Sequence, residues 1–137
     1  MIELVSAIMT KFNATSGTPA AHNNFYTSIG SRLYNTQAPQ NAIFPFAVFT
    51  IVSNINEFTF TTSFENTLVQ FSLFSTSESV QEVKDMFSHC KILFDWCELS
   101  VSGYDFLYMR RENSYLTKDD RPAWQRIVEY RIYDEAN

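Results

Sequence analysis

The sequence predicts an α+β fold, in which a mostly antiparallel β-sheet is packed by two main helices and carries a protruding β-arm. Apolar residues recur at helical spacing in two segments, 2–12 and 80–97. Apolar and polar residues alternate in several segments between and after them, which is typical of strands. Because the predicted strands are not each followed by a helix, the order favours an α+β sheet over a parallel α/β sheet.

The composition is that of one folded domain covering residues 1–137. Hydrophobic residues make up 45% of the chain and aromatic residues 16%, which excludes a disordered or low-complexity chain. The formal net charge is −5, so general affinity for nucleic acid is not expected. Acidic residues exceed basic ones most clearly in residues 57–98, which indicates a solvated acidic face or a surface that meets a basic partner.

The first predicted element is an amphipathic helix in residues 1–14. Leu4, Ile8 and Phe12 fall on one face of it, and the stop signals Gly17 and Pro19 follow. Residues 15–42 form a long polar loop with one short stretch, "FYTSIGSRLY", that is able to order. Loops of this length in a small domain are usually functional or become ordered on a partner.

Strands and the β-arm are predicted in residues 43–76. The segment "IFPFAVFTIV" is almost entirely apolar, which indicates a strand buried on both faces. The segment "NINEFTFTTSFEN" is rich in Thr and Phe and is interpreted as a hairpin or protruding arm. The segment "TLVQFSLFST" alternates like a half-buried strand.

Deletion of residues 57–64 tests the role of this arm. If the arm is an element that contacts another subunit, the deletion should leave a folded monomer that fails to assemble. Circular dichroism and analytical ultracentrifugation would separate the two effects. Loss of folding would show instead that the arm belongs to the core.

A second helix is predicted in residues 78–97 and further strands in residues 98–135, with an interruption at Gly103. Cys90 and Cys97 both fall on the apolar stripe of this helix. Seven residues correspond to a rise of about 10 Å, so the two cysteines should not form a disulfide. The cysteine content therefore predicts a reducing, cytoplasmic setting.

The C-terminal stretch "RPAWQRIVEYRIYDE" has apolar bulk and charge on both sides of its alternation. Its even side, with Val128, Tyr130 and Ile132, is predicted to pack under the helices. Its odd side is predicted to be covered by another subunit, because it combines Ile127 with the polar and aromatic residues Glu129, Arg131 and Tyr133. A charge reversal at Arg131 should then spare folding and abolish assembly.

No catalytic, cofactor-binding or metal-binding residues are predicted, and the chain is not expected to be an enzyme. Its glycines are too scattered for a phosphate-binding loop, and His89 beside Cys90 lacks a second ligand pair for zinc. Asp119 and Asp120 are interpreted as polar residues of a turn. Adjacent Arg110 and Arg111 should point to opposite faces of a strand and form separate salt bridges. Neither a signal peptide nor a membrane-spanning segment is predicted.

Four stretches together resemble the tail-completion, or tail-terminator, proteins of long-tailed bacteriophages and prophages. They are "SRLYNTQAPQNAIFPFAVFTIV", "VQFSLFSTSESVQEV", "LSVSGYDFLYMRREN" and "DDRPAWQRIVEYRI". Their order and spacing cover the chain from about Phe25 to Tyr133. These motifs mark the fold and contain no catalytic residues.

The resemblance implies a structural virion protein that caps the tail tube as a homo-oligomeric ring, usually a hexamer, and forms the head–tail joint. Its implied partners are the tail-tube and head-connector proteins, with DNA only passing through the lumen. Its implied location is the tail or neck of the virion, after assembly in the host bacterial cytoplasm. The resemblance places the loop around Arg32, Tyr34, Ala38 and Pro39 near the ring contacts. It directs the β-arm from Glu57 to Glu65, which includes Phe58 and Phe60, toward a neighbour or the tube.

Two alternatives remain open from the sequence. One is another neck or minor capsid protein of a phage, because such proteins share small α+β or β-rich architectures. The other is a small-ligand-binding or enzymatic α+β domain with an aromatic-lined pocket. A deep apolar pocket with convergent ionisable groups would favour the second alternative.

Overall fold

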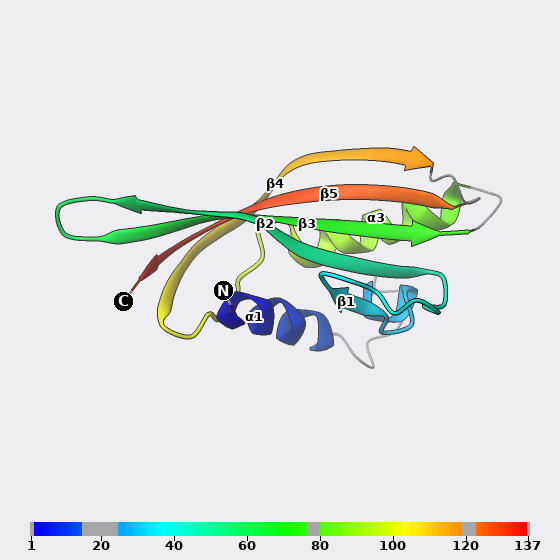
Figure 1. Cartoon of the computed structure of the whole chain (residues 1–137), viewed down its shortest axis with the longest axis horizontal. Coiled ribbons are helices and arrows are strands. Elements are labelled where there is room, and N and C mark those ends of the chain that lie inside the picture. The colour runs from blue at the N-terminus through cyan, green and yellow to red at the C-terminus, as the bar shows by residue number, and fades with distance from the viewer. Residues whose placement is uncertain (1, 15–24, 77–79, 119–122, 137) are drawn as a thin grey trace.

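The computed structural model describes residues 2–14, 25–76, 80–118 and 123–136. Five strands form one sheet in the order β1-β2-β3-β5-β4, and only the β1–β2 pair is parallel. This arrangement confirms the predicted α+β fold with a mostly antiparallel sheet and two main helices, α1 and α3 (Figure 1). The elements are α1 (Ile2–Asn13), α2 (Phe25–Ser28), β1 (Leu33–Asn35), β2 (Phe46–Phe58), β3 (Ser63–Ser75), α3 (Gln81–Phe94), β4 (Tyr104–Lys118) and β5 (Trp124–Ala136).

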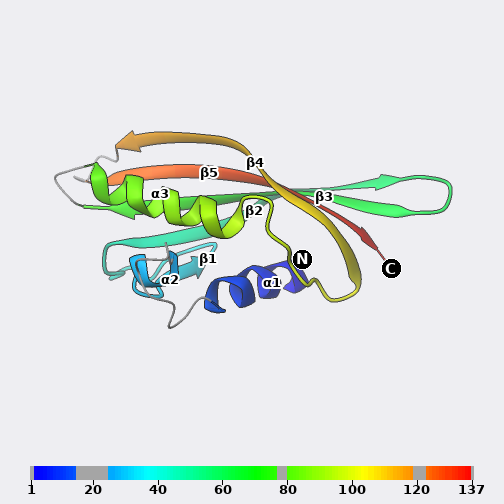
Figure 2. The same cartoon turned by 180° about the vertical axis from the view of Figure 1, so that it is seen from behind.

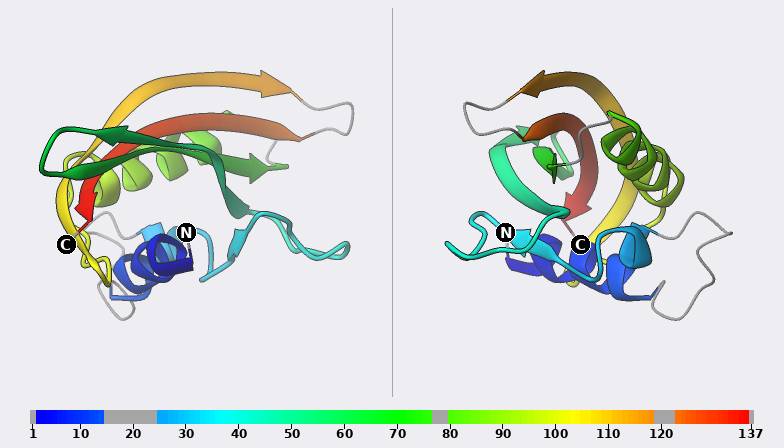
Figure 3. Two further views of the ribbon diagram at one scale, coloured as in Figure 1. Left: turned by 60° about the vertical axis from the view of Figure 1, so that its left-hand side comes forward. Right: turned by 90° about the vertical axis from the view of Figure 1, so that its right-hand side faces the viewer.

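The helices lie on one side of the sheet, and the sheet curves around them (Figures 2 and 3). The alternation of β3 explains this layering, because every second residue from Thr67 to Ser75 is fully buried. Phe71 lies at the centre of the core, where its ring contacts those of Phe49, Phe94 and Tyr130. These three neighbours come from β2, α3 and β5, so one side chain joins four elements.

The helix side of β5 is as the sequence predicts. Val128, Tyr130 and Ile132 are fully buried on the helix side. The side away from the helices carries Glu129, Arg131 and Tyr133, which pair with outward-facing residues of β3. We call this helix-free side the open face of the sheet.

The second helix is shorter than predicted, because α3 ends at Phe94 and does not reach residue 97. Asp95 is extended, Trp96 has a positive φ of 54°, and the Trp96 N–H bonds the Met109 carbonyl of β4 at 2.9 Å. This bond turns the chain toward the sheet. Cys97 therefore continues the apolar stripe in sequence but lies beyond the helix.

The predicted loop of residues 15–42 contains two ordered elements, α2 and β1; residues 15–24 lie outside the described residues. The ordered part matches the stretch "FYTSIGSRLY" that the sequence marks as able to order. Strand β1 runs parallel to β2, with Leu33 opposite Ala47. The connection between these strands, residues 36–45, lies across the open face, where it lines a cleft with β2 and β3. The strand predicted before Gly103 is absent, because residues 98–103 form an irregular segment and a turn; the strand predicted after Gly103 begins directly beyond it, at Tyr104.

Strands β2 and β3 form a long hairpin with a register shift between Ile51 and Ser53. This extra residue at Val52 is a β-bulge, which changes the side to which later β2 residues point. Strand β5 pairs with β3 as far as Phe64, so most of the hairpin belongs to the sheet and only its turn extends past β5. The prediction that this end acts as an arm toward a partner remains a prediction.

Candidate assembly surface

A row of polar side chains crosses four strands of the open face. Arg131 of β5 donates from Nη1 to Asn66 Oδ1 of β3 at 2.8 Å and from Nη2 to Glu112 Oε2 of β4 at 3.0 Å. Asn66 in turn donates to Glu57 of β2 at 3.3 Å, and Glu112 forms a 3.6 Å ion pair with Arg110. We call this set the polar ladder. It fixes the side chains of the open face relative to one another.

Aromatic side chains lie beside the polar ladder. The rings of Tyr108 and Tyr133 stack at 5.5 Å between centroids, and the Phe64 ring lies 6.0 Å from that of Tyr133. All three are partly exposed. Partly exposed aromatic groups beside hydrogen-bonded charges resemble the composition of protein–protein interfaces.

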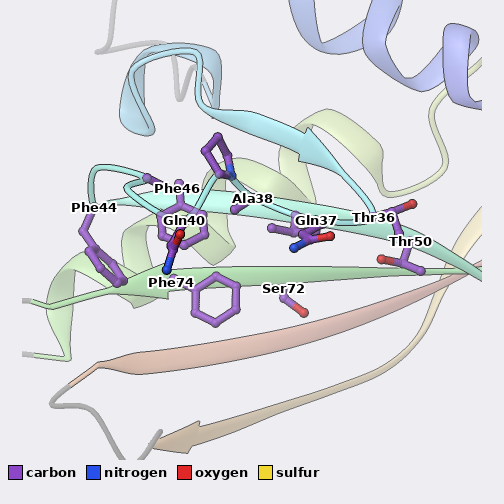
Figure 4. Close-up of a pocket in the computed structure, with 12 residues that line it drawn as sticks. Thr36, Gln37, Ala38, Gln40, Phe44, Phe46, Thr50, Ser72 and Phe74 are labelled. Atoms are coloured by element: carbon purple, nitrogen blue, oxygen red, sulfur yellow. The ribbon is translucent and has the colours of Figure 1, made fainter.

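A cleft of about 470 Å³ occupies one end of the open face. Its floor contains Phe46 and Phe74, stacked at 4.9 Å, and Phe44 lies 4.9 Å from Phe46 (Figure 4). The connection between β1 and β2 forms a wall of the cleft above this floor. None of the residues that line the cleft is titratable: Thr36, Gln37, Ala38, Pro39, Gln40, Ala42, Phe44, Phe46, Val48, Thr50, Ser72 and Phe74.

The turn of the β2–β3 hairpin occupies the opposite end of the sheet (Figure 1). Phe60 at this turn is fully exposed and Phe58 is 75% exposed. The turn itself is well bonded, because the Thr59 hydroxyl accepts the N–H of Thr62 at 3.0 Å and the Thr59 N–H bonds the Thr62 carbonyl at 2.8 Å. Two exposed phenyl groups are thus presented on a hydrogen-bonded turn.

The predicted interface residues fall into three separate groups. Arg32, Tyr34 and Pro39 lie at or beside the cleft, since Pro39 lines it and Tyr34 packs on Phe46 at 6.0 Å. The Arg32 Nε donates to the Pro45 carbonyl at 3.0 Å, where β2 begins. Glu57, Phe58 and Phe60 lie at the hairpin end, and Glu129, Arg131 and Tyr133 lie in the middle of the open face.

Arg110 and Arg111 point to opposite faces, which confirms the sequence prediction. Arg110 pairs with Glu112 on the open face, and Arg111 pairs with Asp95 on the helix side at 3.6 Å. Asp95 also accepts a hydrogen bond from the Tyr130 hydroxyl at 2.5 Å. Burial raises the pKa of Tyr130, so this hydroxyl stays protonated and acts as a donor.

An acidic pair lies on the helix side, where Glu65 and Asp134 are directly opposite on β3 and β5. Asp134 is fully buried, and neither of its carboxyl oxygens has a hydrogen-bond partner within the described structure. Burial, and then the charge of Glu65, raise the pKa of Asp134 to about 6. Glu65 itself accepts a hydrogen bond from the Tyr104 hydroxyl at 3.2 Å.

Asp134→Asn should stabilise the protein at pH 7.5 by on the order of 2–3 kcal/mol, because the raised pKa of Asp134 makes its charged form unfavourable in the fold. The folded state binds a proton between about pH 4 and pH 6 that the unfolded state does not. The free energy of unfolding therefore falls as pH rises through this window, and the neutral variant lacks that fall. Urea unfolding at pH 5 and pH 7.5 measures both effects.

Glu135→Gln is the matched control, because Glu135 is the neighbouring acid and points to the opposite face. This variant should keep the pH dependence of the parent protein. A loss of stability in Asp134→Asn at pH 7.5 would contradict the prediction, because it would show that the carboxylate makes favourable contacts when charged.

The described residues contain no group of three or more His, Cys, Asp or Glu side chains placed to hold a metal ion. Cys90 and Cys97 are free thiols, and burial raises the pKa of Cys97 to about 11. Cys97 donates to the Met109 sulfur at 3.6 Å. Within the described ranges, no helix is both long and apolar enough to span a membrane.

Sequence reasoning named Ala38 and Pro39 but missed the other residues that line the cleft. Its aromatic floor combines Phe44 and Phe46 with Phe74, which lies on another strand and comes into contact only through the Phe46–Phe74 register. The available signal was the Ala-Pro pair at residues 38–39 next to an aromatic strand. That signal indicates a turn and does not show which face the turn covers.

No protein-family model and no curated protein matches the sequence. Solved structures do match, and 26 of their chains are similar to this one. One is a chain of the "Virion of native gene transfer agent (GTA) particle", with a TM-score of 0.74 over 96% of this chain and 97% of that chain. The two chains share a fold. Their sequence identity is 9%, so the similarity concerns architecture alone.

Proposed function

We propose that this chain is a structural protein of a phage-like virion and that it caps the tail tube as a homo-oligomeric ring, a hexamer, at the head–tail joint. The observation that carries the proposal is the shared fold along almost the full length of a chain from a gene transfer agent virion. The four-stretch resemblance to tail-terminator proteins points to the same class of assembly. In this role the ring contacts tail-tube and head-connector proteins, and DNA passes through it without sequence readout.

The open face supports an assembly role. Its polar ladder and its neighbouring aromatic rings span β2, β3, β5 and β4 without a helix covering them. Covering such a face with another protein buries aromatic area while the hydrogen-bonded charges keep their partners. The arrangement favours a binding surface, and we assign it no catalytic step.

Electron microscopy of virions from the encoding genome tests this proposal. Purified particles labelled with an antibody against this chain should show label at the junction of head and tail. Label elsewhere in the neck or capsid would favour the alternative of another neck or minor capsid protein. Absence of the chain from purified virions of cells that produce it would contradict the structural role.

A small-ligand-binding domain is the second candidate, and the cleft is the observation that favours it. Its volume of about 470 Å³ is within the usual range for ligand sites. Its lining has no titratable group, however, so it lacks the convergent ionisable side chains that an acid–base site requires. The cleft therefore fits an uncharged group of a partner better than a reacting substrate.

A further inference from the structure

We infer that the phenyl groups of the hairpin turn, Phe58 and Phe60, bind in the aromatic cleft of a second copy of this chain. This contact extends the proposed ring, on which it rests, by naming what neighbouring copies touch. We call residues 58–62 the tip, and we call the site lined by Phe44, Phe46 and Phe74 the cleft. The two surfaces are far apart in one molecule, match in chemistry and are ordered before they meet.

The tip of one molecule is too far from its own cleft to bind there. Phe46 and Phe58 are the first and last residues of β2, which has 13 residues. At about 3.3 Å per residue the two ends of the strand lie up to about 40 Å apart. A tip therefore reaches a cleft only in another molecule, and such a contact is heterologous, which permits rings.

The tip and the cleft match in chemistry. The chain has a net charge of −5, so contact between two copies is least unfavourable where both surfaces are uncharged. Residues 58–64 are all uncharged, and so are the residues that line the cleft. The nearest charges are complementary: Glu57 adjoins the tip, and Arg32, which has no ion-pair partner among the described residues, is bonded to Pro45 beside the cleft.

Both surfaces are ordered before contact. The Thr59 hydroxyl and backbone close the turn, so Phe60 is held outward on a bonded scaffold. The cleft floor is fixed by the packing of Phe46 on Phe44, Phe74 and Tyr34. Little conformational entropy is then lost on binding. The cleft volume of about 470 Å³ leaves room for aromatic side chains.

Two variants that disable one partner each test the contact. The tip variant is Phe58→Ser with Phe60→Ser, and the cleft variant is Ala38→Glu, which places a carboxylate in the uncharged cleft. Sedimentation at concentrations up to about 1 mM should show self-association of the wild type. The association constant of each variant should be at least about 30-fold lower. Thr61→Ala is the matched control at the same turn, and it should associate like the wild type.

Mixing the variants gives the more specific result. A heterologous contact leaves one intact tip and one intact cleft in the mixture, so the two variants should form heterodimers and nothing larger. A bis-maleimide should likewise cross-link a mixture of Thr61→Cys, which keeps both phenyl groups, and Gln40→Cys, each made with Cys97→Ser, and should cross-link neither variant alone. Circular dichroism confirms that each variant is folded.

Three outcomes would overturn the contact: a wild type that stays monomeric at about 1 mM, association that survives both variants, or a mixture without the cross-link. The proposed virion role is judged separately by labelling of particles. If the tip variant enters virions as well as the wild type, the contact is wrong while the structural role stands. If the cross-link forms but the chain never enters virions, the contact stands and the proposed function fails.

Discussion

Replacing Phe71 by alanine is expected to lower the free energy of unfolding by about 3–5 kcal/mol. Phe71 is fully buried, and its ring contacts Phe94 at 4.8 Å, Tyr130 at 5.7 Å and Phe49 at 5.8 Å. The substitution would leave a cavity between two layers that cannot close without moving α3. Domains of this size are typically stable by about 5–15 kcal/mol, so the loss is a large share. Urea unfolding followed by tryptophan fluorescence measures it.

Phe60→Ala provides the matched control, because it makes the same chemical change at a fully exposed position. Exposed substitutions away from special backbone geometry usually change stability by less than about 0.5 kcal/mol. An equal loss in both variants would contradict the assignment of Phe71 to the core centre and of Phe60 to a surface site.

Arg131→Glu is expected to abolish assembly while the monomer stays folded. The side chain of Arg131 is 20% exposed and holds the polar ladder together through Asn66 and Glu112. Reversal of its charge places a second carboxylate beside that of Glu112 and leaves the Asn66 side-chain oxygen without its donor. The free energy of unfolding of the monomer should fall by about 1–3 kcal/mol. Like charges in an interface should weaken binding by several kcal/mol more. Thermal unfolding of the monomer and incorporation into particles measure the two effects.

Lys84→Glu is the control for net charge, because it makes the same change at an exposed position of α3 on the other side of the sheet. This variant should assemble normally. If Arg131→Glu assembles as well as Lys84→Glu, the middle of the open face is not an interface.

The sequence was sufficient where a local repeat determines which side chains are buried. The period of two in β5 predicts that Val128, Tyr130 and Ile132 are in the core, and the same period separates Arg110 from Arg111. The apolar stripe of α3 is likewise a local signal. The end of α3 is not a local signal. The chain leaves the helix at Asp95, where Trp96 bonds Met109, a residue of another element.

Features that depend on pairing between strands far apart in the chain could not be predicted from the sequence. The three residues of β1 are too few to show alternation, so the parallel β1–β2 pair gave no signal. The position of β5 between β3 and β4 depends on which strands meet, and a single sequence contains no record of that. The cleft also depends on the path of residues 36–45 across one face.

The sheet order also has a consequence for synthesis on the ribosome. Strand β3 pairs along its length with β5, yet Trp124 follows Ser75 by 49 residues. At about 5–20 residues per second, β3 waits roughly 2–10 s for that partner. Until then the polar ladder lacks Arg131, and the open face does not exist. A nascent chain therefore cannot join an assembly through this face before β5 has been made and paired.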